Sequence, residues 1–396
     1  MPSKTDPSAS KPKPDFAELS IAVVGGLALA LIALFLCVVP LTGEVASGRD
    51  FVVYWATGQQ LTHHANPYDA EAMMRIERTA GLPAQYGTLY MRNPPLYLLL
   101  AYPLGFIGLR MGALIWALIM AGLFVVSVRM VWAIHGSQKN RLHWLGYSFA
   151  PAMVCVFAGQ TSLIALLGLV LFLRYHAARP FVAGLSLWLC ALKPHLFLPF
   201  GIALLAWIAV TRSYKMVAGV ATAFAASCGL VYCIDPKAWA EYLTMIHTSG
   251  VIQEYIPCLS VALRLWINPH FIWIAYVPAA VGCTWALGYF LVRRHEWDWI
   301  KDGSLLMLVS ILVAPYCWMF DQSLAVPALL HGAYITRRRV LLTVLAFTSI
   351  LLDAELVGGV KAASFLFLWT QPAWLIWYLI ASWGGRRLAA GQAANQ

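Results

Sequence analysis

Apolar runs long enough to cross a lipid bilayer recur along almost the whole chain, and this feature constrains the fold most. Examples are residues 20–41, 111–134 and 214–234, and a spanning helix needs about 20 mostly apolar residues. Of the 396 residues, 61% are hydrophobic and only 11% are charged, which is far from the composition of a soluble globular domain. The sequence therefore predicts an all-α polytopic membrane protein.

The charged residues and cysteines exclude two other classes of protein. The formal net charge is +10, but the basic residues form small groups between apolar runs rather than one basic face, so we interpret them as topology signals and expect no nucleic-acid partner. The eight cysteines lie mostly inside apolar runs, and none forms a Cys-x-x-Cys pair. We interpret them as small buried hydrophobes, with neither a zinc site nor a disulfide framework.

The Lys and Arg positions orient the apolar runs, because loops rich in these residues stay on the cytoplasmic side. Residues 1–19 are rich in Pro, Ser and Lys, so we expect a disordered cytoplasmic tail and not a signal peptide. The run 20–41 then crosses outward into an external loop, residues 42–92. The stretch 94–109 is interrupted by Pro103, Gly105 and Gly108, and we expect it to dip into the membrane without crossing, so that Lys139 and Arg141 stay inside.

The alternation then continues to the end of the chain. It predicts about 12 transmembrane helices in one transmembrane domain, residues 20–383, with a second external loop at 235–268. Both termini are cytoplasmic, and residues 384–396 form a cytoplasmic tail. After residues 20–41, the expected spans are residues 111–134, 144–158, 160–174, 181–192, 196–211, 214–234, 271–292, 304–320, 323–335, 340–359 and 362–383.

Short polar motifs gather on the external side of this topology. An ionisable group at membrane depth costs about 2.5–3.5 kcal/mol on insertion scales, so such residues usually face a cavity or a partner. We therefore expect a hydrophilic cavity that opens outward. The motifs are RD at 49–50, NPYD at 66–69, RNPP at 92–95, GQTS at 159–162, LKPH at 192–195 and FDQS at 320–323.

Several of these motifs also have a purely structural explanation. Asp50 could pair with Arg49 or cap a following helix, and NPYD and RNPP are typical of turns and helix starts. Gln160 could cap a helix or join two helices. Asp321 and Gln322 could form a short extracellular turn instead of facing a cavity.

The LKPH motif is harder to explain by structure alone. Pro194 breaks a helix beside Lys193 and His195, and broken helices recur at binding sites for anionic ligands, although transporters use the same device. His63 and His64 lie in the first external loop without a metal-ligand spacing, and we expect no metal site there.

The order of the motifs resembles a known family. DFVVYWATG, NPYD, YMRNPPLYLLLAYPL, GQTSLIALLGLVLFLR and GLSLWLCALKPHLFLPF, between Gly48 and Thr211, are similar to glycosyltransferase family 87, also called DUF2029. The resemblance implies an integral membrane hexosyltransferase of the GT-C fold in the bacterial plasma (inner) membrane. Such an enzyme takes mannose from a polyprenyl-phosphate carrier to a glycolipid or polysaccharide acceptor on the outer face.

The resemblance also implies roles for individual residues. In GT-C enzymes an Asp just after the first membrane helix is the catalytic acid/base, and Asp50 has that position. Inversion in a single displacement needs one carboxylate to take the hydroxyl proton. The departing phosphate needs cations or hydrogen-bond donors, and Lys193, His195 and Arg92 are the candidates.

The remaining candidates would line the substrate groove. No acidic pair in the first loop has a metal-ligand spacing, so we expect a metal-independent mechanism with no cofactor. The candidate groove residues are Arg49, Tyr54, Trp55, Asn93, Gln160, Asp321 and Gln322.

Other functions remain open on the sequence. A secondary transporter or lipid-linked sugar flippase would place its polar interruptions near the midplane of two related halves. Here they cluster toward the outer ends and no internal repeat is visible, which favours the enzyme. An inactive family member acting as a partner subunit is a third hypothesis. Glucose, galactose or a pentose such as arabinose would require the same base and the same phosphate-binding groups as mannose.

Overall fold

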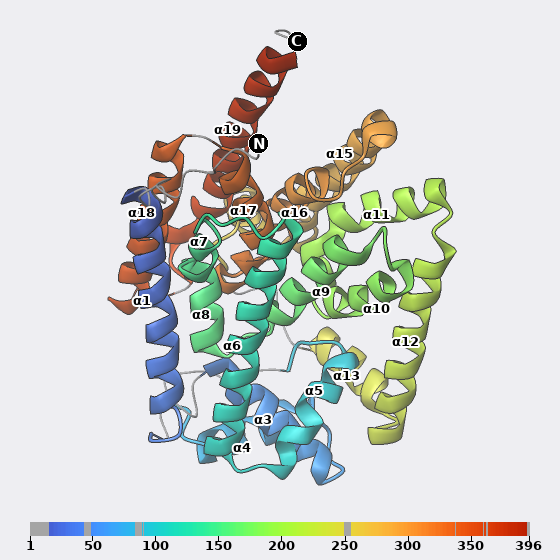
Figure 1. Ribbon diagram of the computed structural model, residues 1–396. Helices are drawn as coiled ribbons and strands as arrows, with labels where there is room; N and C mark the ends of the chain where they lie inside the picture. The colour runs from blue at the N-terminus through green and yellow to red at the C-terminus, as the bar shows by residue number, and fades with distance from the viewer. Residues whose placement is uncertain are drawn as a thin grey trace, which may run out of the picture.

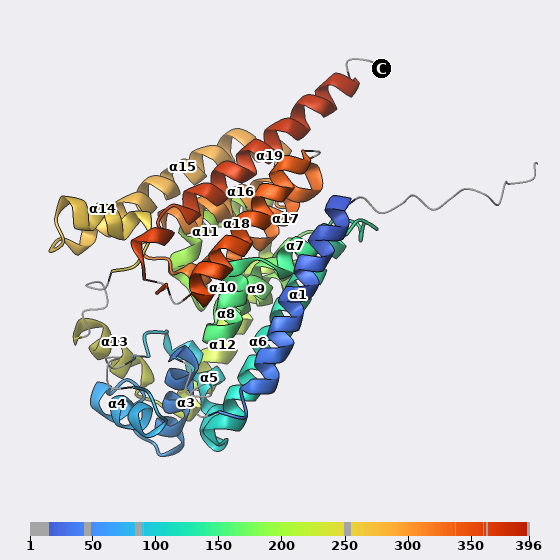
Figure 2. The ribbon, with the colours of Figure 1, turned by 90° about the vertical axis from the view of Figure 1, so that its left-hand side faces the viewer.

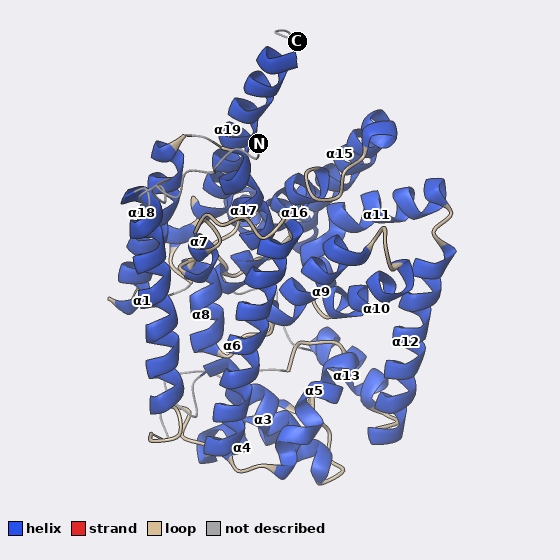
Figure 3. Ribbon diagram, viewed as in Figure 1, coloured by secondary structure: helices blue, strands red, loops and turns tan. Residues whose placement is uncertain are grey.

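The computed structural model describes residues 16–42, 49–83, 89, 91–248, 255–336, 338–358, 360–361 and 363–393. Within these ranges the chain forms helices and loops and no strand (Figure 3). The predicted tail at 1–19 lies mostly outside the described residues. At both ends of the chain the helices are longer than expected. α1 (Phe16–Val38) begins before residue 20, and α19 (Thr370–Ala393) continues past Trp383.

Seven helices in the described part of the chain are long and apolar enough to span a membrane. They are Glu18–Val38, Leu109–Ile134, Pro194–Thr211, Tyr214–Ile234, Ile272–Glu296, Arg339–Val357 and Phe365–Trp383. Shorter apolar helices cover Pro95–Phe106, Ser162–Tyr175, Pro180–Ala191 and Asp302–Val313. The chain is therefore an all-α, multi-pass membrane protein.

Two of the predicted spans are broken or shortened. The run 144–158 forms α7 (Trp144–Tyr147) and α8 (Ala150–Ala158), separated at Ser148 and Phe149, because Pro151 lies in the first turn of α8 and starts a new helix there. The run 304–320 ends early: α16 (Asp302–Val313) stops at Val313, and the chain then enters the 3₁₀ helix η7 (Met319–Ala325) before α17 (Val326–Ile335).

The expected external loops contain helices of their own. The first holds α3 (Arg49–Thr62) and α4 (Ala70–Thr79), and the second holds α13 (Ala238–Thr248) and α14 (Leu259–Ile267). The two loops meet where the rings of Tyr68 and Tyr242 lie 5.5 Å apart. In Figures 1 and 2, α3, α4, α5 and α13 lie toward the lower end of the molecule, whereas α19 ends at the upper end, toward which α1 also begins.

The interrupted stretch 94–109 forms three short pieces against α3. They are η1 (Pro95–Tyr97), α5 (Leu98–Ala101) and η2 (Tyr102–Phe106), and only then does the long α6 (Leu109–Ile134) begin. A Cβ atom on Gly58 would lie 2.4 Å from the carbonyl oxygen of Ala101, so glycine is needed for this approach. Gln59 Nε2 donates to the Gly105 carbonyl (2.9 Å), which fixes α3 to this stretch.

A pair of glycines allows another close contact between two helices. In the layer of α9 (Ser162–Tyr175), α10 (Pro180–Ala191) and α12 (Tyr214–Ile234), a Cβ atom on Gly184 would lie 2.1 Å from the Met216 carbonyl oxygen, and one on Gly219 would lie 2.2 Å from that of Phe181. The backbones of α10 and α12 therefore touch, as small residues allow in membrane helix pairs.

Seven further helices lie in the described part of the chain. They are η3 (Pro194–Phe197), α11 (Leu198–Thr211), η5 (Ile272–Tyr276), α15 (Val277–Arg293), η6 (Arg294–Glu296), α18 (Arg339–Val357) and η8 (Phe365–Phe367). In Figure 1, α15 and α19 extend upward, away from α3.

Candidate functional site

Lys193 is the hub of a buried polar network. Its Nζ donates to Asp321 Oδ1 (2.7 Å), Ser162 Oγ (2.8 Å) and Gln160 Oε1 (3.2 Å). An ammonium group has three donors and no acceptor. All three N–H bonds of Lys193 are thus used, and the side chain is 9% exposed.

The helix break at Pro194 places Lys193 there. α10 ends at Ala191, and Pro194 opens the 3₁₀ helix η3. Because Pro disfavours a helical conformation at the residue before it, Lys193 leaves the helix with φ −128°. The break that the LKPH motif predicts is present.

Asp321 is the counter-ion, and it is not part of an exposed turn. Its Oδ1 accepts from Ser162 Oγ (2.6 Å) as well as from Lys193, and its Oδ2 accepts from the Trp318 amide (2.9 Å). Asp321 is 1% exposed and Gln322 is fully buried, where Gln322 Oε1 accepts from Trp374 Nε1 (2.8 Å). The alternative of a short extracellular turn is therefore wrong, because both side chains face inward and are bonded there.

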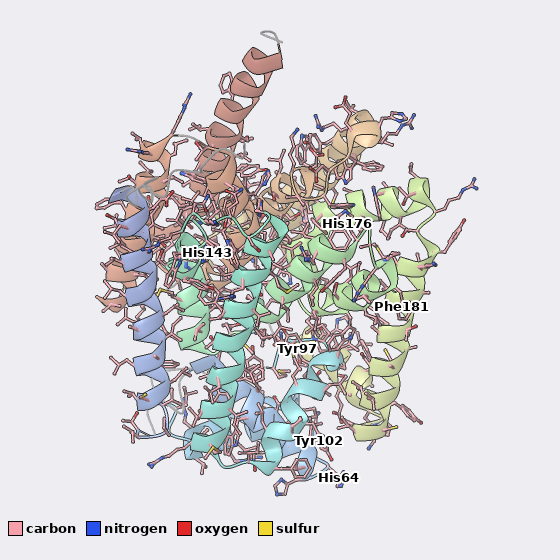
Figure 4. All side chains as sticks on the ribbon, in the orientation of Figure 1. His64, Tyr97, Tyr102, His143, His176 and Phe181 are labelled. Carbon is pink, nitrogen blue, oxygen red and sulfur yellow. The ribbon has the colours of Figure 1, made fainter. Side chains whose placement is uncertain are left out.

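Aromatic side chains surround this ion pair. Lys193 Nζ lies 5.2 Å from the centre of the Phe320 ring, a distance at which the ring attracts a cation. On the other side, Tyr97 donates to Thr161 Oγ1 (2.5 Å), and Tyr54 stacks on Tyr97 with ring centroids 6.2 Å apart. Figure 4 shows Tyr97 inward of Tyr102 and His64, which lie at the lower end of the molecule.

Asp50 is brought close to this network by a tight contact. It is the second residue of α3 and is half-buried. Gly159 ends α8 in the left-handed conformation (φ +70°), and a Cβ atom there would lie 3.1 Å from Phe51 Cβ and 3.5 Å from Phe51 N. The first turn of α3 thus rests on the residue that precedes Gln160.

Tyr54 lies near both Asp50 and Lys193. Both charged groups are close enough to the Tyr54 hydroxyl to interact with it electrostatically. The sequence stretches around Asp50, RNPP, GQTS, LKPH and FDQS, which are far apart in the chain, therefore meet in one region of the fold.

His195 and the RNPP motif lie at the edge of this region. His195 stacks on Tyr316 with ring centroids 3.9 Å apart, and its Nε2 is buried without a hydrogen-bond partner among the described residues. Arg92 and Asn93 are half-buried. The Tyr68 hydroxyl donates to the Asn93 carbonyl (3.4 Å), which ties NPYD to RNPP.

Other predicted residues have structural contacts. Trp55 Nε1 donates to the Ile107 carbonyl (2.9 Å) and holds α3 to η2. Of Arg49 only the backbone is described. His63 Nδ1 lies 2.7 Å from the Gln59 carbonyl oxygen. Within the described residues, no group of three His, Cys, Asp or Glu side chains could hold a metal ion.

Sequence reasoning did not assign Ser162, Thr161, Tyr97 or Tyr316 to the site. Ser162 and Thr161 belong to the GQTS motif, and Tyr97 follows RNPP. These motifs could therefore have pointed to the three residues as members of the site. Tyr316 lies in the stretch before FDQS and has no distinguishing pattern around it.

A comparison with protein families decides the class of this chain. The model of glycosyltransferase family 87 matches residues 90–315, which is more than half of the 396 residues. The chain belongs to glycosyltransferase family 87. No curated protein and no solved structure matches it.

Membership of family 87 makes this chain a membrane glycosyltransferase, which uses a sugar donor and an acceptor. The match contains Gln160, Lys193 and His195, and it runs beyond Thr211, where the resemblance of individual motifs ends. Asp50 lies before the match and Asp321 lies just after it.

Proposed function

We propose that this family 87 glycosyltransferase moves a hexose, with mannose as the first candidate, from a polyprenyl-phosphate carrier to a glycolipid or polysaccharide acceptor. The observation that supports the proposal is the contact of Phe51, which follows Asp50 in the first turn of α3, with Gly159, which precedes Gln160 of the buried Lys193 network. A carboxylate and a set of fixed donors on one side of a membrane domain are the groups that sugar transfer from a phosphate requires.

In this reaction Asp50 is the base. The acceptor hydroxyl attacks the anomeric carbon while the bond from that carbon to the phosphate oxygen breaks. Asp50 takes the hydroxyl proton, and polyprenyl phosphate leaves with the electron pair of the broken bond. One displacement inverts the anomeric centre, so no second catalytic carboxylate is needed. The mechanism that we propose uses no metal or cofactor.

The phosphate would lie on the side of Arg92, Lys193 and His195. A good leaving group still needs donors for its developing charge. His195 Nε2 is buried and has no partner among the described residues, which supports a role for it in binding this group. Tyr54, Asn93, Asp321 and Gln322 would form or support the walls of the groove, with Arg49, Trp55 and Gln160.

The membrane orientation is part of the proposal. We place residues 20–383 in one GT-C domain of about 12 crossings in a bacterial inner membrane, with cytoplasmic termini and an outward-facing site. The arrangement in Figure 1 supports this, since α19 ends at the upper end and α3 lies at the lower end. The short helices α8 and α17, with the apolar helices Ser162–Tyr175, Pro180–Ala191 and Asp302–Val313, would supply the crossings beyond the seven long ones.

The experiment is a donor panel. Purified protein in liposomes receives polyprenyl phosphates of mannose, glucose, galactose and arabinose together with a total-lipid extract, and release of free polyprenyl phosphate is followed for each donor. Consumption of one hexose donor with a new glycolipid product supports the proposal. Movement of an intact lipid-linked sugar across the bilayer, without release, would instead identify a flippase.

A further inference from the structure

The side chain of Gln160 can take only one orientation in its surroundings. Its amide lies 3.2 Å from Lys193 Nζ. An ammonium group only donates hydrogen bonds, so the amide oxygen must face it. The NH₂ group, with two N–H donors, then faces away from Lys193, and Gln160 Nε2 has no hydrogen-bond partner among the described residues.

Lys193 itself has no donor left for a substrate. Its three N–H bonds go to Asp321, Ser162 and Gln160. Direct binding of a phosphate would require one of these bonds to break, and the bond to Asp321 belongs to a buried ion pair whose disruption is strongly unfavourable. The ion pair is therefore suited to hold its neighbours in place.

Gln160 is also the accessible member of the network. It is half-buried, whereas Lys193 and Asp321 are buried. The residue before it, Gly159, contacts the first turn of α3, where Asp50 lies. Of the residues in the network, Gln160 is therefore the one that we expect a ligand bound near the first turn of α3 to contact.

We propose that Gln160 is a ligand of the donor phosphate and that Lys193, paired with Asp321, is a positioning residue that fixes the amide with its N–H bonds outward. This inference rests on the proposed function and specifies it further. An amide that is held in one orientation loses no further rotamer freedom when it binds the charged oxygen. A hydrogen bond to a charged group of this kind changes affinity by about 10- to 100-fold.

The test compares Gln160→Met and Gln160→Glu with Gln138→Met as a matched control, because Gln138 is exposed and its side-chain Oε1 accepts from the neighbouring Asn140. Binding of farnesyl phosphate to purified protein in nanodiscs is measured by titration calorimetry. We expect about 10- to 100-fold weaker binding for Gln160→Met, still weaker binding for Gln160→Glu, and no change for the control.

The opposite result would overturn the inference. If Lys193 binds the phosphate directly, Gln160→Met frees one of its N–H bonds, and farnesyl phosphate would bind equally or more tightly. Gln160→Glu keeps an oxygen that accepts from Lys193 and so preserves the network. This variant can therefore be tested even if Gln160→Met does not fold. Inorganic phosphate in the same titration is expected to bind at least 10-fold more weakly, and equal binding would contradict a lipid-linked ligand.

Different results would contradict the proposed function and the role of Gln160. A wild-type protein that binds no farnesyl phosphate and consumes no donor would contradict the proposed function. A wild-type protein that binds it as tightly as Gln160→Met does would contradict only the role of Gln160. Lys193→Met/Asp321→Leu, which removes both charges of the ion pair, should change affinity by less than about threefold when it is made in the Gln160→Met background, since a positioning residue has no effect once its partner is absent.

Discussion

Replacing Lys193 by Met should destabilise the protein strongly. The variant leaves the Asp321 carboxylate, which is 1% exposed, without its cation. Breaking a buried ion pair from one side costs about 3–5 kcal/mol. Lys215→Met is the matched control, because Lys215 is exposed and such a substitution changes the free energy of unfolding by about 0.5 kcal/mol or less.

The structure also predicts how the destabilisation of Lys193→Met compares with that of a double variant. In Lys193→Met/Asp321→Leu both charges are gone. What remains is the loss of the acceptor for the Trp318 amide and Ser162 Oγ and of the donor to Gln160 and Ser162, worth about 1–3 kcal/mol if the amide stays buried. The double variant should therefore be more stable than Lys193→Met alone, and the costs of the two single variants should not add.

The assay is equilibrium unfolding in mixed detergent micelles, followed by tryptophan fluorescence. Wild type, Lys193→Met, Asp321→Leu, the double variant and Lys215→Met are all measured under the same conditions, so that differences in the free energy of unfolding can be compared. The reasoning is refuted if Lys193→Met unfolds like Lys215→Met, or if the double variant loses the sum of the two single losses. Either result would mean that Lys193 and Asp321 are hydrated and not paired as described.

Three further predictions concern packing, capping and pH. Gly219→Ala should cost about 1–3 kcal/mol of unfolding free energy, because its Cβ would lie 2.2 Å from the Phe181 carbonyl oxygen, whereas Gly229→Ala, with no atom within 4 Å, should be neutral or stabilising. Asp69→Ala removes the N-cap of α4 and should lower the local stability of this helix by about 0.5–2 kcal/mol, measured as faster amide hydrogen exchange in its first turn. Asp69→Ser should restore the slower exchange, because serine also caps a helix. Burial raises the pKa of Glu77 to about 7, so the folded protein holds a proton that the unfolded chain releases. The melting temperature should fall as pH rises from about 5 to 7 and then level off, and Glu77→Gln should remove that slope.

The membrane character of the fold could be predicted because it depends on local sequence. Length and hydropathy are enough to locate runs such as 111–134 and 214–234, and proline chemistry is enough to place the break at Lys193. The helices α3, α4, α13 and α14 were missed because they are short or carry polar residues. The rule for spanning helices does not detect such segments, and their stability comes from packing against the rest of the protein.

The convergence of the polar motifs could be predicted only coarsely. The topology puts them on one side, but the partner of Lys193 is Asp321, 128 residues further along the chain. No local pattern selects that pairing, because it depends on how α9, α10 and η7 pack. The contact of Gly159 with α3 is likewise a tertiary feature, although the glycine itself is visible in the GQTS motif.

The most direct measurement is donor turnover by Asp50→Asn. Release of polyprenyl phosphate from the preferred donor is compared in wild type, Asp50→Asn and Asp235→Asn, where Asp235 is an acidic residue of the second loop whose carboxylate accepts from the nearby Lys237 amide. We predict a loss of about 10²- to 10⁴-fold in Asp50→Asn, with unchanged binding of farnesyl phosphate and full activity in Asp235→Asn. Equal turnover by wild type and Asp50→Asn would contradict the account, since the acceptor proton would then go to another group.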